Sequence, residues 1–163
     1  MAMLPVVPEW EPVLGSAFAP DCERTRAPIE RRVAALGLQP VRWPSHWPPD
    51  TTRAMLAATY AKRIGRAVAF SLAGFRQAFA GGRDLSQEDT ILIAGAACEM
   101  HPTAMLKGIA MASTATALRS ATLRAREAGA ARLPAIQVGH RVYTGPDAID
   151  RAANALEQSA ASG

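Results

Sequence analysis

A helical hydrophobic period that continues from Arg53 to about Gly129 is the feature that most limits the folds open to this chain. Apolar residues recur three and four positions apart through this block, as they do on one face of a helix. Asp50 or Thr51 can accept a hydrogen bond from a free amide of a first turn, so we expect the first helix to begin there. Residues 50–129 are therefore predicted to form a helical subdomain.

Breaks in this period divide the block into shorter helices. Gly81-Gly82 interrupts it, and His101-Pro102 is typical of a helix start because proline is tolerated in a first turn. Residues 86–89 (Ser-Gln-Glu-Asp) resemble a capping box, with Asp in place of the usual Glu or Gln, and predict another start. A longer helix is expected from Ser113 or Thr114 to Gly129.

After Gly129 the hydrophobic period changes from that of a helix to that of a β-strand. Residues 133–138 and 141–143 are short β-prone runs, and the Gly139-His140 pair between them is typical of a hairpin link. Gly145-Pro146-Asp147 then opens a last amphipathic helix. The C-terminal part is therefore predicted to be a hairpin followed by a helix.

The first 50 residues carry weaker signals. Residues 6–14 alternate as a strand does, but their two prolines each remove a ladder donor and confine such a strand to an edge. A loop then leads to a predicted helix over residues 29–36, ended by Gly37. Residues 38–43 predict a brief strand, and the proline-rich residues 43–50 predict an extended connection.

Composition sets the class of protein and excludes several functions. A chain of 163 residues with 49% hydrophobic and 20% charged residues matches one soluble globular domain. The formal charge is +4, but arginines alternate with alanine and are interleaved with Asp and Glu, so we expect no nucleic-acid partner. No run approaches the ~20 apolar residues of a membrane span and no signal-peptide pattern opens the chain, so we expect a cytoplasmic protein.

The cysteines and histidines suggest no reactive or metal centre. Cys22 and Cys98 lie far apart and form no Cys-x-x-Cys pair, so both are expected to be free thiols. Cys98 ends an apolar helix and is expected to be buried. Cys22 lies in a polar loop, and we expect it to be an exposed thiol with no functional role. The spacing of the three histidines and two cysteines fits no metal site, so we predict no metal.

Four segments resemble one known family in their order and spacing. They are Trp10-Glu-Pro-Val-Leu-Gly15, Trp43-Pro-Ser-His-Trp-Pro-Pro-Asp-Thr51, Gly82-Arg-Asp-Leu85, and Leu133-Pro134 running into Tyr143-Thr-Gly-Pro-Asp147. Together they resemble DsbA-type thioredoxin-fold proteins of the 2-hydroxychromene-2-carboxylate isomerase and kappa-class glutathione transferase branch. The resemblance implies an α/β, thioredoxin-like sheet with an inserted helical subdomain. Residues 1–163 would form one domain, with 50–129 as the insertion and 6–43 and 130–158 as remnants of the thioredoxin core.

The resemblance also implies an N-terminally truncated fold. In that family a strand, a tight turn bearing the catalytic Ser or Cys, and a helix precede the segment similar to residues 6–14. A strand-plus-helix unit needs about 30 residues, and only Met1 to Pro5 precede that segment here. The expectation is a chain that holds no catalytic residue of its own.

A glutathione site at Leu133, Pro134 and Asp147 follows from the same resemblance. The backbone of Leu133, ahead of a cis-proline, would meet the cysteinyl part of glutathione as an added strand does, and Asp147 would accept the glutamyl ammonium. Pro146 stands where relatives often have a Ser or Gln that donates to the glutamyl carboxylate. Two simpler interpretations stay open: Pro134 is an ordinary trans proline that opens a strand, and Asp147 only stabilises the helix dipole.

The resemblance also implies a substrate site. The positions that line the substrate side of the cleft in the relatives are occupied here by Trp43, His46 and Trp47. An aromatic wall with one polar group suits a small-molecule substrate that is a flat aromatic acid. The alternative to a substrate site is structural: both tryptophans pack the proline-rich segment against the core, and His46 is exposed to solvent.

Three functions are compatible with these observations. The first is a glutathione-linked isomerase- or transferase-like protein, with glutathione as cofactor. The second is a non-catalytic interaction module that uses its cleft or an open sheet edge to pair with another chain, including a second copy in a homodimer. The third is a thiol-disulfide oxidoreductase, against which the missing Cys-x-x-Cys argues.

Overall fold

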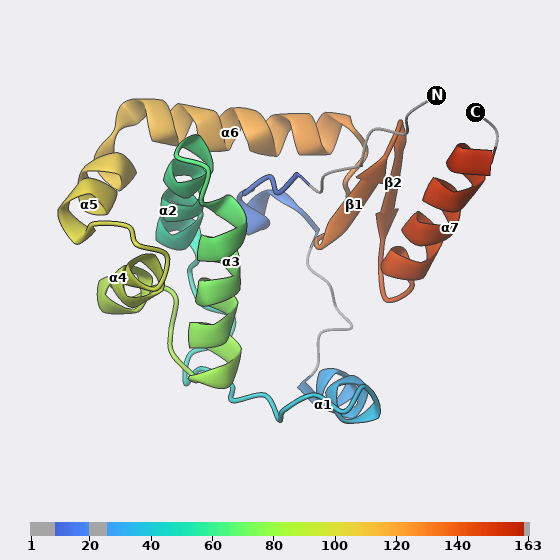
Figure 1. Ribbon diagram of the computed structural model, residues 1–163, viewed down its shortest axis with the longest axis horizontal. Coiled ribbons are helices and arrows are strands. Elements are labelled where there is room, and N and C mark those ends of the chain that lie inside the picture. Colours follow the sequence, from blue (N-terminus) through green and yellow to red (C-terminus); the bar gives the residue numbers. More distant parts are fainter. Residues whose placement is uncertain (1–8, 20–25, 162–163) are drawn as a thin grey trace.

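The computed structural model describes residues 9–19 and 26–161, and these ranges are mostly helical. In chain order the elements are η1 (Gly15–Ala17), α1 (Arg26–Ala35), α2 (Thr52–Arg63), α3 (Ala67–Phe75), η2 (Arg76–Ala80), α4 (Glu88–Ala96), α5 (Pro102–Ala110), α6 (Ala112–Glu127), β1 (Ala135–Val138), β2 (Arg141–Thr144) and α7 (Ala148–Ala161). Figure 1 shows α2 to α6 on one side, the β1–β2 hairpin with α7 on the other, and α1 by itself below them. None of the described helices combines the length and apolar composition that a membrane span requires.

The core of the helical block is built largely from small side chains. Helix α2 packs against α3, α4, α5 and α6. It buries only small side chains, namely Ala54, Ala57, Ala58, Thr59 and Ala61. Gly108 of α5 lies so close to Tyr60 of α2 that a Cβ at Gly108 would overlap the tyrosine ring. Small residues at these contacts let the helix backbones approach each other closely.

Most predicted ends of these helices are confirmed, and local chemistry explains them. The Asp50 carboxylate accepts a hydrogen bond from the Thr52 N–H at 2.9 Å, and this bond lowers the pKa of Asp50. Helix α5 begins at Pro102, as predicted. Gly82 and Gly129 adopt positive φ angles of 67° and 97° after η2 and α6, in the left-handed region that glycine enters without steric cost.

The predicted capping box over residues 86–89 is wrong. Helix α4 begins at Glu88, and its N-cap residue Gln87 makes no side-chain capping bond. The Asp84 carboxylate instead accepts a hydrogen bond from the Ser86 N–H at 2.8 Å. This upstream carboxylate orders the turn before the helix, so Ser86 lies in that turn and does not begin the helix.

The predicted hairpin and last helix are confirmed. β1 and β2 pair antiparallel through Gly139-His140, with Ile136 opposite Tyr143. Helix α7 packs against both strands. This unit has a small core of its own, in which the buried residues are Tyr143, Ala148 and Ala152.

The predicted edge strand over residues 6–14 is wrong for its described part, residues 9–14, which join no sheet; residues 6–8 lie outside the described ranges. Side chains hold this segment instead. The Leu14 N–H donates to Thr122 Oγ1 at 3.0 Å, and Lys62 Nζ lies 2.6 Å from a Glu11 carboxylate oxygen. The segment therefore ties α2 to α6 without a strand ladder.

Helix α1 begins at Arg26, three residues before the predicted start, and Gly37 follows it with a φ of 64°.

The brief strand predicted over residues 38–43 is wrong, because no other described segment pairs with it along a ladder. The Arg42 N–H donates to the Phe79 carbonyl at 2.8 Å, at the end of η2. One such bond anchors the segment but does not make a strand.

Candidate functional site

The hairpin register brings Leu133, Pro134 and Asp147 to one end of the β1–β2 hairpin. Ala135 at the start of β1 pairs with Thr144 at the end of β2, so residues just before β1 and just after β2 lie at the same end. The Leu133–Pro134 peptide bond is cis, as the resemblance implied. Leu133 is half-buried, whereas Pro134 and Asp147 are exposed.

Asp147 belongs to the turn that starts α7. Its carbonyl accepts a hydrogen bond from the Arg151 N–H at 3.0 Å, and Gly145 turns the chain with a φ of 94°. The Asp147 carboxylate forms no ion pair or hydrogen bond with any other described residue. It can therefore meet a ligand cation, and it also lies where an anion stabilises the helix dipole. Both interpretations fit this geometry.

Trp43 and Trp47 belong to an aromatic cluster, with Phe79 as the third ring. The two tryptophan rings are 5.1 Å apart between centroids, and Phe79 of η2 lies 6.1 Å from Trp43 and 5.7 Å from Trp47. Pro44 between them is fully buried. These contacts are those expected if the tryptophans hold the proline-rich run onto the helical block.

Two residues of α1 also contact Trp43. Trp43 Nε1 donates to Glu30 Oε1 at 2.7 Å, and the Arg26 guanidinium lies 5.5 Å from the Trp43 ring centroid. Sequence reasoning missed Arg26, Glu30 and Phe79, because nothing local in the sequence indicates which distant side chain an indole will meet. Trp43 thus joins α1 to η2.

His46 is exposed on the same run, and its Nδ1 lies 3.4 Å from Ser45 Oγ. A hydrogen bond from Ser86 lowers the pKa of Asp84 most, and the charge of His46 lowers it further. His46 therefore lies near the loop that precedes α4. Among the described residues, no three Cys, His, Asp or Glu side chains gather as metal ligands would.

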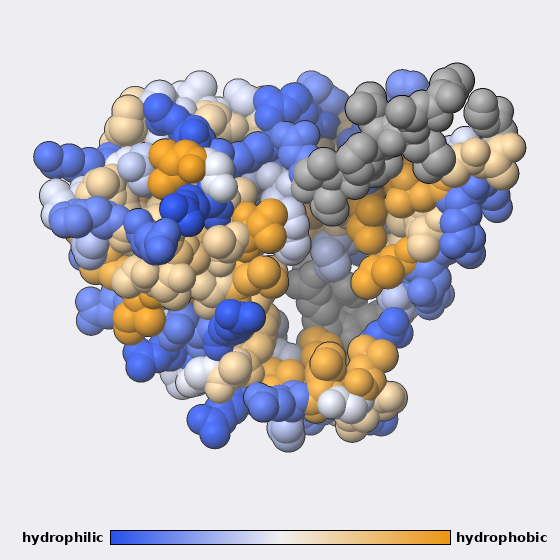
Figure 2. All heavy atoms as spheres, in the orientation of Figure 1, coloured by the Kyte–Doolittle hydropathy of each residue, from blue (hydrophilic) through white to orange (hydrophobic). Residues whose placement is uncertain are grey.

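Figure 2 allows one further feature of the surface near these elements to be described. Figure 2 shows the surface hollowed between α3, α1 and the start of α7. In Figure 1 the end of the hairpin that carries residues 133–134 and 147 lies on one side of this space, and the lower end of α3 lies on the other. The hairpin end and α3 thus border the hollow from different sides.

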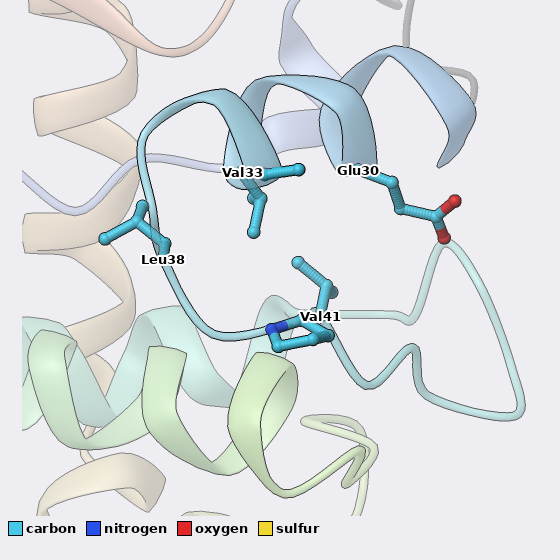
Figure 3. A pocket seen from close by; sticks show the side chains of 6 residues that line it. Glu30, Val33, Leu38 and Val41 are labelled. Carbon is cyan, nitrogen blue, oxygen red and sulfur yellow. The ribbon is translucent and has the colours of Figure 1, made fainter.

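A groove lies between α1 and residues 38–41. It has a volume of about 300 Å³ and is lined by Glu30, Val33, Ala34, Leu38, Pro40 and Val41. Figure 3 shows the Val33 and Val41 side chains converging on it from α1 and from the returning chain. Because one Glu30 oxygen already accepts from Trp43, this groove offers mainly apolar contacts.

Cys98 is buried beyond the end of α4 and is a free thiol, as predicted, whereas Cys22 lies outside the described residues. Burial raises the pKa of the Cys98 thiol, and the nearby Arg66 charge opposes that rise only in part. A thiol held protonated is a poor nucleophile. Cys98 therefore lacks the lowered pKa that makes a cysteine reactive.

A pH series on Cys98 tests this conclusion. Because folding keeps the thiol protonated, the free energy of unfolding should fall as the pH rises above the ordinary thiol pKa of about 8.5. The Cys98→Ala variant should show a shallower decline in urea melts, since it removes this contribution and leaves other titrating groups unchanged. Parallel slopes for the two proteins would contradict a raised pKa at Cys98.

Comparisons with known proteins agree with the fold. No protein-family model and no curated protein matches the sequence. Among solved structures the chain is similar to the selenomethionine form of 2-hydroxychromene-2-carboxylate isomerase, with a TM-score of 0.73 and 15% sequence identity. The match covers 83% of this chain and 65% of the isomerase. The helices and the hairpin thus have the DsbA-type fold of that isomerase, while the division into core remnants and an insertion stays a prediction.

Proposed function

We propose that this chain binds glutathione at the end of the β1–β2 hairpin and acts as a glutathione-linked isomerase- or transferase-like protein. The observation that supports this proposal is the position of Leu133, Pro134 and Asp147 at one end of the hairpin, fixed by the pairing of Ala135 with Thr144. A peptide-like ligand needs an extended backbone to lie against and a charge to meet its terminus. At this end β1 begins at Ala135, directly after Pro134, and Asp147 carries the charge.

The proposed contacts follow the chemistry of the tripeptide. The cysteinyl part would lie along the backbone ahead of Pro134, as an added strand lies along a sheet edge. The glutamyl ammonium would meet the exposed Asp147 carboxylate. The thiol would then point toward the hollow, where Trp43, His46 and Trp47 would form the far wall for an aromatic acid substrate.

Calorimetric titration of glutathione into the Asp147→Asn variant tests this site. Loss of a charge-assisted bond to an ammonium should weaken binding by about tenfold, because such bonds contribute about 1.5 kcal/mol or more. The matched control is Asp150→Asn, which removes another exposed carboxylate from the first turn of the same helix. We expect this control to bind glutathione within about twofold of the original chain, because Asp150 lies beyond the turn.

The two possible failures have different meanings. A chain that shows no binding heat at millimolar glutathione would overturn the proposed function. If the chain binds glutathione but both variants bind equally well, the ligand lies elsewhere and the role of Asp147 is limited to the helix dipole.

A second candidate, a non-catalytic interaction module, is favoured by a separate observation. Val68, Leu72 and Phe75 on α3 are 45%, 46% and 48% exposed. Exposed apolar side chains that gather on one helix are typical of a surface that pairs with another chain.

A further inference from the structure

The aromatic cluster of Trp43, Trp47 and Phe79 continues onto α3. The Phe79 ring stacks on that of Phe75, with the ring centroids 6.2 Å apart and the ring planes inclined by 23°. Phe75 in turn lies 6.3 Å from Trp10, again between centroids. These contacts make one continuous aromatic row, which runs through Trp47, Phe79, Phe75 and Trp10. The row joins the proposed substrate wall to the exposed side of α3.

A π-helical turn holds the middle of the aromatic row. The segment η2 is a π-helix, and the Gly81 N–H donates to the Arg76 carbonyl, five residues back, at 2.9 Å. The Phe79 carbonyl of this turn accepts from the Arg42 N–H, which keeps the proline-rich run beside η2. Isolated π-helical turns are rare in proteins and are frequent at functional sites. The backbone therefore gives a second reason, besides the rings, to place a ligand here.

The aromatic row is covered at one end and open at the other. Trp47 and Phe79 are half-buried, as expected of side chains that also hold the proline-rich run. Phe75 and Trp10 are 48% and 40% exposed. Figure 2 shows hydrophobic side chains on the side of α3 that borders the hollow. Exposed rings next to a hollow suit a flat apolar ligand, because such a ligand can stack on them and exclude water.

Arginines are the unpaired charges next to the aromatic row in the chain. Arg42 comes directly before the tryptophan-containing run, and Arg76 comes directly after Phe75. Both arginines are exposed, and neither forms an ion pair with another described residue. The two carboxylates that flank Trp10 already contact Lys62. The free charge beside the row is therefore positive and favours a ligand with an anionic group.

We infer that Phe75 and Trp10 are specificity-determining residues, which make the site select elongated fused-ring aromatic acids over single-ring acids. This inference rests on the proposed function, since it assigns the aromatic row to the substrate. A single-ring acid can lie against one pair of these side chains at a time, whereas a ligand of four fused rings can contact Phe79 and Phe75 together. One further ring contact of this kind raises affinity by about fivefold.

Equilibrium dialysis with benzoate and pyrenecarboxylate as probes, without glutathione, tests the inference. Pyrenecarboxylate should bind at least about tenfold more tightly than benzoate. Phe75→Leu keeps an apolar side chain but removes the ring, so it should reduce this preference by about fivefold, whereas Phe75→Tyr should retain it. The control Leu123→Ala removes an exposed apolar side chain of α6, outside the aromatic row, and should leave the preference unchanged. Thermal melts show that each variant is folded.

Three results would overturn the inference: equal affinities for the two acids, a Phe75→Leu variant that keeps the full preference, or a Leu123→Ala variant that loses as much of it. The anionic group has its own test. Pyrenemethanol carries the same rings without the charge and should bind roughly two- to fivefold more weakly than pyrenecarboxylate. Equal binding of the alcohol would overturn the assignment of the arginines.

The dialysis separates this inference from the proposed function. Because no glutathione is present, the preference for fused rings does not depend on whether glutathione binds. Calorimetric titration of the original chain and of Asp147→Asn with glutathione measures that binding separately. A chain that binds glutathione but shows no fused-ring preference would overturn only the role of Phe75 and Trp10.

Discussion

Replacing Gly108 with valine is expected to lower the free energy of unfolding by about 3 kcal/mol, the upper end of the usual cost of overpacking. A side chain at Gly108 of α5 would overlap ring atoms of Tyr60 on α2. The ring is rigid and cannot bend away, so the two helices must separate. For a chain of this size the melting temperature should fall by about 9 °C, which calorimetry measures directly.

Gly95→Ala is the matched control for this prediction. A Cβ at Gly95 would also be crowded, at 2.6 Å from Sδ of Met105, but this atom is near the flexible end of a methionine side chain. The methionine can rotate away, and alanine favours the helix by roughly 0.5 to 1 kcal/mol over glycine. The expected net change is within about 1 kcal/mol of zero. A Gly95→Ala variant as unstable as Gly108→Val would show that flexibility of the neighbour does not decide the cost.

Trp43→Ala is expected to cost about 2 to 3 kcal/mol, less than a fully buried tryptophan because Trp43 is half-buried. It removes the ring contacts with Trp47 and Phe79 and both contacts with α1. Because α1 buries no residue of its own, its amides should then exchange with solvent much faster. Hydrogen exchange on peptides from residues 26–35 measures this effect.

Trp43→Phe separates the two contributions. Phenylalanine retains an aromatic ring for the cluster but cannot donate to Glu30, so the expected cost is only about 1 kcal/mol, the usual value of one hydrogen bond. We expect α1 to exchange at an intermediate rate in this variant. If α1 exchanged at the original rate in both variants, the attachment of α1 to Trp43 would be wrong.

The sequence predicted best those elements whose ends depend on neighbouring residues. Pro102, Gly129 and the Gly139-His140 link mark their boundaries through backbone geometry alone, and the structure places helix and hairpin ends beside them. The strand predicted over residues 38–43 is wrong because a strand needs a partner, and a pattern within one segment does not reveal whether a partner exists.

The candidate site was predictable only in part, because the sequence reveals local contacts and not contacts between distant segments. The hairpin has a local signal in the sequence, and its register places Pro134 and Asp147 at the same end. The partners of Trp43 come from α1 and η2, which are separate in the sequence, and no spacing rule connects them. Sequence reasoning also did not predict that Val68, Leu72 and Phe75 of α3 are exposed, because this spacing fits a buried helix face as well as an exposed one.

The unequal sizes of the two cores bear on how the molecule responds to heat. The helical block has an extensive core, whereas the hairpin and α7 share only Tyr143, Ala148 and Ala152 as fully covered side chains. A two-stranded hairpin is marginal without such support. Transient opening of the hairpin and α7 therefore costs less free energy than global unfolding, as for any unit with few buried contacts. A ligand held at the end of this hairpin would lose its binding surface at temperatures where the helices are still intact, and its presence would in turn suppress that opening.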